Sequence, residues 1–159
     1  MTDSTIHDAA PIAATTAAAP ADVEGLARQL PGFQQGARWF WWIAGLSAVN
    51  VGCDLAHADF GFVLGLAFTQ LAHAVFAANL LIALVIDVLF IGGFYLIGQQ
   101  AQKGRTWAFV LGALVYLCDG LLYLKLEMWL SVAFHAFALF QIGKAFMGLQ
   151  AAKKAFGLR

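Results

Sequence analysis

The sequence predicts an all-α polytopic membrane protein, in which four transmembrane helices form a bundle and a short amphipathic or re-entrant helix precedes the second crossing. The first observation is composition: 62% of the 159 residues are hydrophobic and 11% are charged, whereas soluble domains have about 45–50% and about 25%. The second is the apolar stretch 76–98, which holds one charged residue, Asp87, at its middle. A helix of about 20 apolar residues spans the hydrocarbon core of a bilayer, so this stretch predicts a crossing.

The N-terminal segment 1–35 is rich in Ala, Thr and Pro and contains a single base, Arg28. It lacks the basic start and the apolar core of a secretory signal, and its composition is typical of a disordered cytoplasmic tail. Within this segment a short amphipathic helix over 21–30 is an alternative, because apolar side chains recur there at helical spacing. The Pro-Gly pair at 31–32 is expected to end that helix.

The first predicted crossing is 37–55. It begins with Arg38 and a run of aromatic residues, and a base beside indole rings is typical of the membrane interface. Small residues recur every four positions along this helix, which lets a neighbouring helix approach closely. Polar residues at i, i+3 and i+7 share another face of it. They are Ser47, Asn50 and Asp54.

The apolar run 62–98 is too long for one crossing. Its 37 residues would extend about 55 Å as a single helix, against a hydrocarbon core of about 30 Å. We therefore expect a short amphipathic or re-entrant helix over 61–75, which carries His73, and then the second crossing over 76–98. One long tilted helix is the alternative.

Two further crossings are predicted over 106–124 and 128–148, and each has a tryptophan near its start. Tyr116 and Asp119 share a polar face of the third crossing, together with a second tyrosine, and the fourth crossing carries His135. These helices complete a bundle whose intramembrane polar residues come from all of its segments.

The distribution of bases predicts the orientation. The transmembrane domain is expected over 36–150, and a basic cytoplasmic end is expected over 151–159. With four crossings, Lys125 falls on one side of the membrane and the other eight bases fall on the opposite side. Those eight are Arg28, Arg38, Lys103, Arg105, Lys144, Lys153, Lys154 and Arg159. Because bases accumulate on the cytoplasmic side, both termini are predicted to be cytoplasmic.

A set of aromatic, glycine and ionisable residues marks the third and fourth crossings. They are Trp107, Phe109, Gly112, Tyr116, Asp119, Gly120, Phe134, His135 and Phe137. With these residues, the segment 38–148 resembles a widespread group of small four-helix bacterial membrane proteins. The resemblance implies the four-helix fold and a bacterial origin, and hence the inner membrane, but it implies no activity.

The two halves of the transmembrane domain also resemble each other. A Cys-Asp dipeptide precedes a histidine in each half: Asp54 precedes His73, and Asp119 precedes His135. The two Asp–His spacings differ, at 19 and 16 residues. Duplication of a two-helix unit and coincidence therefore both stay open.

Polar and ionisable side chains inside the expected bundle form the candidate site. They are Ser47, Asn50, Asp54, His73, Asp87, Tyr116, Asp119 and His135. A charged group at mid-membrane costs at least about 2.5 kcal/mol, so such residues face protein or water. We expect protonated carboxyl groups that hydrogen-bond neighbouring helices and hold the bundle together. Asp119 is expected to bond His135 or the polar face of the first crossing, and Asp87 is expected to be neutral.

These observations favour a structural, accessory or partner-binding role in the lipid bilayer, with another membrane protein or a second copy of the chain as partner. The alternative is a small ion- or proton-coupled carrier that acts as an oligomer, because four helices leave little room for an enclosed pathway. A haem or metal site at His73 and His135 has less support, since no second ligand motif accompanies either histidine. No cofactor is expected.

The sequence contains no motif that is typical of an enzyme or a nucleic-acid-binding protein. The sequence contains no phosphate-binding loop, no dinucleotide fingerprint and no nucleophile with a paired base, so we expect that the protein is not an enzyme. Its net charge is zero, which gives no sign of nucleic-acid binding. Whether Cys53 and Cys118 form a disulfide stays open, since both are expected at similar depth in the bundle.

Overall fold

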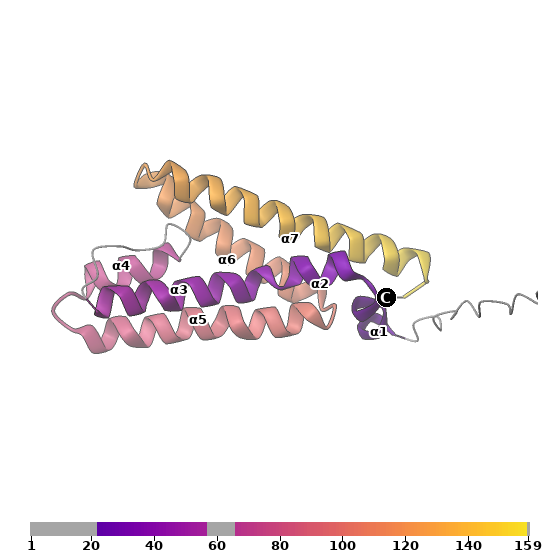
Figure 1. Cartoon of the computed structure of the whole chain (residues 1–159), viewed down its shortest axis with the longest axis horizontal. Helices are drawn as coiled ribbons and strands as arrows, with labels where there is room; N and C mark the ends of the chain where they lie inside the picture. The colour runs from indigo at the N-terminus through magenta and orange to yellow at the C-terminus, as the bar shows by residue number, and fades with distance from the viewer. Residues whose placement is uncertain (1–21, 57–65, 159) are drawn as a thin grey trace, which may run out of the picture.

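The computed structural model describes residues 22–56 and 66–158, and this part of the chain is helical and contains no strand (Figure 1). The all-α prediction is therefore confirmed. The helices are α1 (Val23–Gln29), α2 (Pro31–Ala37), α3 (Trp39–Leu55), α4 (Ala67–Val75), α5 (Leu80–Gln102), α6 (Thr106–Lys125) and α7 (Trp129–Ala155).

The segment 22–35, expected as part of a disordered tail, instead forms helix α1 and most of α2, and α1 corresponds to the short helix predicted as the alternative over 21–30. The Asp22 carboxylate accepts a hydrogen bond of 2.6 Å from the Gly25 N–H and so caps α1. Pro31 begins α2, because its missing N–H would have no partner in the first turn of a helix anyway. Leu26 is buried, so α1 belongs to the core. Residues 1–21 lie outside the described part of the chain.

Helix α3 continues from α2 with little interruption. The linking residue, Arg38, has φ −66° and ψ −16°, which are helical angles. The segment from Pro31 to Leu55 is therefore nearly a single rod. The predicted first crossing, 37–55, ends where α3 ends.

Helix α5 begins four residues later than the predicted second crossing, 76–98, and runs to Gln102. The reason is a local cap: the side-chain oxygen of Asn79 accepts a hydrogen bond of 3.4 Å from the Ile82 N–H. Asp87 is consequently the eighth residue of α5 and not its midpoint. The run 62–98 contains two separate helices, α4 and α5, so the single long helix is excluded.

Among the described residues, three helices are long and apolar enough to cross a membrane: α5, α6 and α7. Helix α7 extends beyond the predicted limit at 148 and continues to Ala155. Residues 151–155 of the expected basic end, 151–159, therefore belong to α7 and not to a separate segment.

The helices form two antiparallel pairs, α3 with α5 and α6 with α7 (Figure 1). At one end, hereafter the α1 end, α2 packs against α7 and α5 packs against α6. Toward the opposite end, hereafter the α4 end, the two pairs diverge. Helix α4 lies in this opening, where it contacts α3, α5 and α6. The short helix therefore fills a space that the long helices leave.

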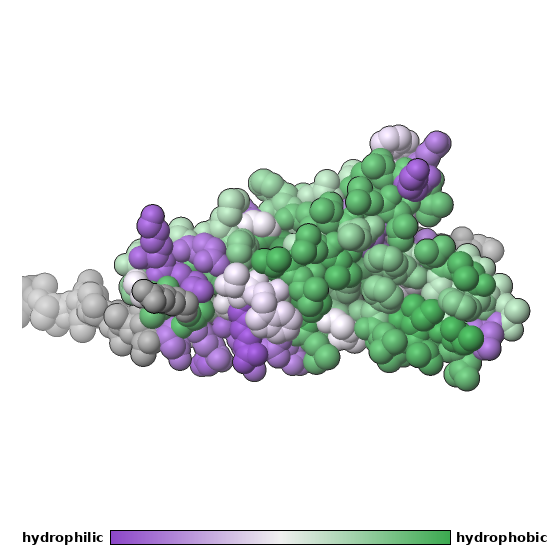
Figure 2. Space-filling view, turned by 180° about the vertical axis from the view of Figure 1, so that it is seen from behind, coloured by the Kyte–Doolittle hydropathy of each residue, from purple (hydrophilic) through white to green (hydrophobic). Residues whose placement is uncertain are grey.

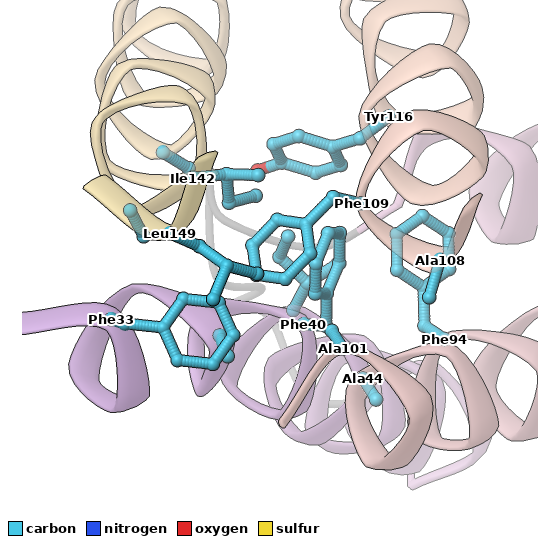
Figure 3. Close-up of a cluster of buried hydrophobic side chains, with 14 of the residues drawn as sticks. Phe33, Phe40, Ala44, Phe94, Ala101, Ala108, Phe109, Tyr116, Ile142 and Leu149 are labelled. Atoms are coloured by element: carbon cyan, nitrogen blue, oxygen red, sulfur yellow. The ribbon is translucent and has the colours of Figure 1, made fainter. Parts of the chain in front are cut away.

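An aromatic core joins the two pairs (Figure 3). The Phe109 ring lies 5.3 Å from the Phe33 ring and 5.8 Å from the Phe40 ring, measured between centroids. A Cβ on Gly112 would collide with the Phe40 ring, so this glycine permits the close approach of α6 to α3. Apolar packing therefore fixes the α1 end, whereas the α4 end depends on α4.

The exterior of the bundle is apolar. Figure 2 shows hydrophobic residues over most of the length of the molecule and hydrophilic residues gathered at the α1 end. Large aliphatic side chains such as Leu81, Val88 and Leu130 are exposed. Such an exterior, on helices of this length, is compatible with a membrane protein.

Candidate functional site

Asp119 of α6 caps the N-terminus of α4. Its Oδ2 accepts a hydrogen bond of 2.9 Å from the Ala67 N–H, and its Oδ1 accepts one of 2.9 Å from the Phe68 N–H. The side chain is 0% exposed. The first N–H groups of a helix have no partner inside that helix, and they carry its positive partial charge. A buried carboxylate from another helix thus satisfies two of these groups.

Ser47 of α3 completes this cap. Its hydroxyl accepts a hydrogen bond of 3.0 Å from the Leu66 N–H and donates one of 2.8 Å to the Ile43 carbonyl. Position 66 is a leucine, whose side chain cannot cap the helix that follows it. The N-terminus of α4 therefore depends on two long helices, one from each antiparallel pair.

His135 of α7 binds the same carboxylate. Its Nε2 lies 3.0 Å from Asp119 Oδ2, and its Nδ1 lies 2.8 Å from the Ser131 carbonyl oxygen. Because a carbonyl only accepts, Nδ1 carries a hydrogen and donates it. The contact between Nε2 and Oδ2 must then contain one further proton, bound to either atom. The predicted hydrogen bond from Asp119 to His135 is confirmed.

Aromatic rings enclose His135. The Tyr116 ring stacks on the imidazole with centroids 4.2 Å apart and planes 18° apart, and the Tyr123 ring lies 5.1 Å away. A Cβ on Gly120 would lie 3.2 Å from His135, so the α6 backbone is also close to the histidine. The Tyr116 hydroxyl is buried and has no hydrogen-bond partner among the residues that the structure describes. The tyrosine thus supports the histidine by stacking.

A second Asp–His pair joins α4 to α5. His73 Nε2 lies 2.7 Å from Asp87 Oδ2. Asp87 is 2% exposed, and its Oδ1 has no hydrogen-bond partner among the residues that the structure describes. His73 is 18% exposed and lines a pocket of about 210 Å³, together with Asp54 at the end of α3. This pair is therefore close to the surface.

Helix α4 carries both polar clusters. Its N-terminus binds Asp119 and Ser47, and its last turn binds Asp87 through His73. The Phe68 and Phe90 rings stack between these points, with centroids 4.7 Å apart. Three long helices therefore hold α4 by directional bonds, in addition to its apolar contacts.

The structure places seven of the eight predicted site residues in two groups. The first group surrounds the N-terminus of α4 and comprises Ser47, Tyr116, Asp119 and His135. The second group lies around the pocket and comprises Asp54, His73 and Asp87. Asn50 is buried on α3.

Sequence reasoning missed two kinds of partner. The first is the set of backbone N–H groups of Leu66, Ala67 and Phe68, because backbone groups are the same in every sequence. A usable signal is the absence of a capping residue at position 66. The second is the pairing of His73 with Asp87, which lie 14 positions apart on different helices.

The structure also bears on the metal site and on the disulfide that the sequence leaves as alternatives. Within 22–56 and 66–158, no group of three His, Cys, Asp or Glu residues is placed to hold a metal ion. Cys53 and Cys118 are both free thiols, so the disulfide left open by the sequence is not formed.

No family model matches the chain, and no curated protein or solved structure is significantly similar to it. Its function must therefore be argued from α4 and the two Asp–His pairs.

Proposed function

We propose that the protein is a small integral protein of the bacterial inner membrane with a structural, accessory or partner-binding role. In this proposal α3, α5, α6 and α7 cross the bilayer, and polar groups around α4 hold them together. The observation that carries the proposal is the Asp119 cluster. Both oxygens of the Asp119 carboxylate and both nitrogens of the His135 imidazole are engaged by the protein itself, so this buried pair offers no vacant group to a substrate.

The length of α3 supports a fourth crossing. Its 17 residues extend about 26 Å, and the nearly continuous rod from Pro31 to Leu55 extends about 37 Å. A hydrocarbon core is about 30 Å thick. Four crossings also bring both chain ends to one side, together with eight of the nine bases.

The contacts of α4 support a re-entrant helix. Asp119 lies six residues before the end of α6, about 9 Å from the α4 end of the bundle. Backbone at such a depth must be satisfied by protein, since lipid offers no hydrogen bonds. Ser47 and Asp119 supply the acceptors that the first N–H groups of α4 require.

Reporter fusions test the four-crossing topology. Fusions after Gln100 and after Glu127 are expected to report opposite sides of the membrane, with Gln100 cytoplasmic. The same side for both fusions would contradict the topology.

Reconstitution tests the role. Purified protein in liposomes with a pH-sensitive dye inside is expected to give the same proton leak as protein-free liposomes under an imposed gradient. A protein-dependent flux would contradict a structural role.

A small proton-coupled carrier is the second candidate, and the Asp87–His73 pair is the observation that favours it. Asp87 has an oxygen without a partner among the described residues, and its histidine reaches a surface pocket. A carrier requires Asp87 to change charge during its cycle, which asparagine cannot do. If wild-type protein carries protons and Asp87→Asn does not, this candidate replaces the first.

A further inference from the structure

Helices α2 and α7 pack together at the α1 end (Figure 1). A groove of about 350 Å³ lies between them, and no residue of either Asp–His pair lines it. Its size falls within the usual range of ligand sites, about 300–1,000 Å³. The side chains that shape it are Pro31, Phe33, Gln35, Trp39, Gln141 and Lys144.

Glycines determine the shape of the groove. Gly36 lies so close to α7 that a Cβ there would collide with Ala145, so the two helices close the groove at this point. Gly32 and Gly148 also line it, and a Cβ on either would meet no atom within 4 Å. The groove is therefore closed where the helices touch and open beside these two residues.

The lining combines one positive charge with apolar walls. Among the described residues that form it, Lys144 is the one charged side chain, and no acid is present. The amides of Gln35 and Gln141 add hydrogen-bonding groups, and Pro31 and Trp39 form apolar surface. This combination suits an amphiphile with an anionic head.

Lys144 lies near the cytoplasmic end of the proposed fourth crossing, just inside a hydrocarbon core of about 30 Å. Trp129, an exposed interface residue, begins α7, and Lys144 follows fifteen residues later, about 22 Å along the helix axis. The lysine stem then carries the ammonium group farther toward water. Arg38, which links α2 to α3, lies toward the same end of the molecule.

We propose that this groove binds one anionic phospholipid of the leaflet at the α1 end. The lipid phosphate pairs with Lys144 and hydrogen-bonds the amides of Gln35 and Gln141, while an acyl chain lies against Pro31 and Trp39. The lipid would thus bridge α2 and α7 at the point where the N-terminal helices meet the bundle. Basic sites between helices on the cytoplasmic side are typical of lipid headgroup binding.

Native mass spectrometry of lipid-depleted protein tests the proposal. The full chain in detergent is titrated with phosphatidylglycerol and with phosphatidylcholine of the same acyl chains. We expect one phosphatidylglycerol per chain to be retained in preference to phosphatidylcholine. Equal retention of the two lipids would overturn the proposal, and so would a dimer that forms without lipid and occupies the groove.

Two matched pairs of variants locate the lipid. Lys144→Gln should weaken phosphatidylglycerol binding about fivefold, as expected for one lysine near a membrane surface. Lys154→Gln, an exposed lysine of α7 outside the groove, should change it little. An equal effect of the two substitutions would overturn the assignment of the phosphate to Lys144.

Gly148→Leu should fill the groove and abolish retention of the lipid. Gly143→Leu is its control, since Gly143 also has open space around its Cβ position but does not line the groove. Both variants should fold, because leucine is a better helix former than glycine. Wild-type retention by Gly148→Leu would overturn the proposal.

Discussion

The two Asp–His pairs of this protein use the same side chains in different surroundings. Asp119 and His135 are almost completely buried, and every polar atom of the two side chains has a partner within the protein. Asp87 has one oxygen without a partner among the described residues, and His73 reaches a surface pocket. The difference indicates a structural pair at the N-terminus of α4 and a pair that water or protons can reach.

The difference follows from where each pair meets α4. Asp119 accepts the first N–H groups of that helix, where the helix dipole favours a negative charge. Asp87 meets α4 through a side chain near its C-terminal end, where no N–H groups remain unpaired. One carboxylate therefore determines where α4 begins, whereas the other adds a single side-chain contact.

The largest expected effect is that of Asp119→Leu. The substitution leaves two buried N–H groups without their acceptor and His135 Nε2 without its hydrogen-bond partner. Loss of one partner of such a buried cluster costs about 3 kcal/mol of the free energy of unfolding. Denaturant unfolding in mixed micelles measures it, with Asp54→Leu at the exposed end of α3 as control. Equal stability of the two variants would mean that Asp119 does not hold α4.

Asparagine substitutions at Asp119 and Asp87 compare the two Asp–His pairs with a smaller expected loss of stability. Asp119→Asn retains one acceptor but turns an amide toward a backbone N–H, so we expect a loss of about 1.5 kcal/mol. Asp87→Asn retains its contact with His73 and should change stability by less than about 0.5 kcal/mol. The same unfolding assay compares them. If Asp87→Asn were the more destabilising, the roles assigned to the two pairs would be reversed.

The smallest expected effect is a difference between the two histidines in their access to a chemical reagent. Diethyl pyrocarbonate should modify His73, whose ring reaches the pocket, before His135, whose two nitrogens are both bonded inside the bundle. Peptide mass spectrometry after short exposure in detergent distinguishes the two sites. Modification of both histidines at one rate would show that the pairs do not differ in access.

Hydropathy and helical spacing predict most of the architecture, because the long helices are determined by apolar length. The hydrogen bond from Asp119 to His135 was also predictable, since both residues lie on polar faces of helices that are adjacent in the sequence. The start of α5 depends instead on the cap at Asn79, which a hydropathy pattern does not detect. The packing of α1 and α2 depends on contacts that are distant in sequence.

The candidate site was only partly predictable, for a related reason. The similarity between the two halves of the sequence would pair Asp54 with His73, whereas the structure pairs Asp87 with His73. Asp54 lines the same pocket but lies at the exposed end of α3. Spacing along a chain places a residue on a helix face, but the packing of that helix decides which partner the residue meets.

Amide hydrogen exchange tests the central claim, that Asp119 holds the N-terminus of α4. In wild-type protein and in Asp87→Asn, the Ala67 and Phe68 amides should exchange slowly. In Asp119→Asn they should exchange at least about tenfold faster, while the amides of α5 near Phe94 stay protected. Unchanged protection of Ala67 and Phe68 in Asp119→Asn, or an equal loss in Asp87→Asn, would contradict the claim.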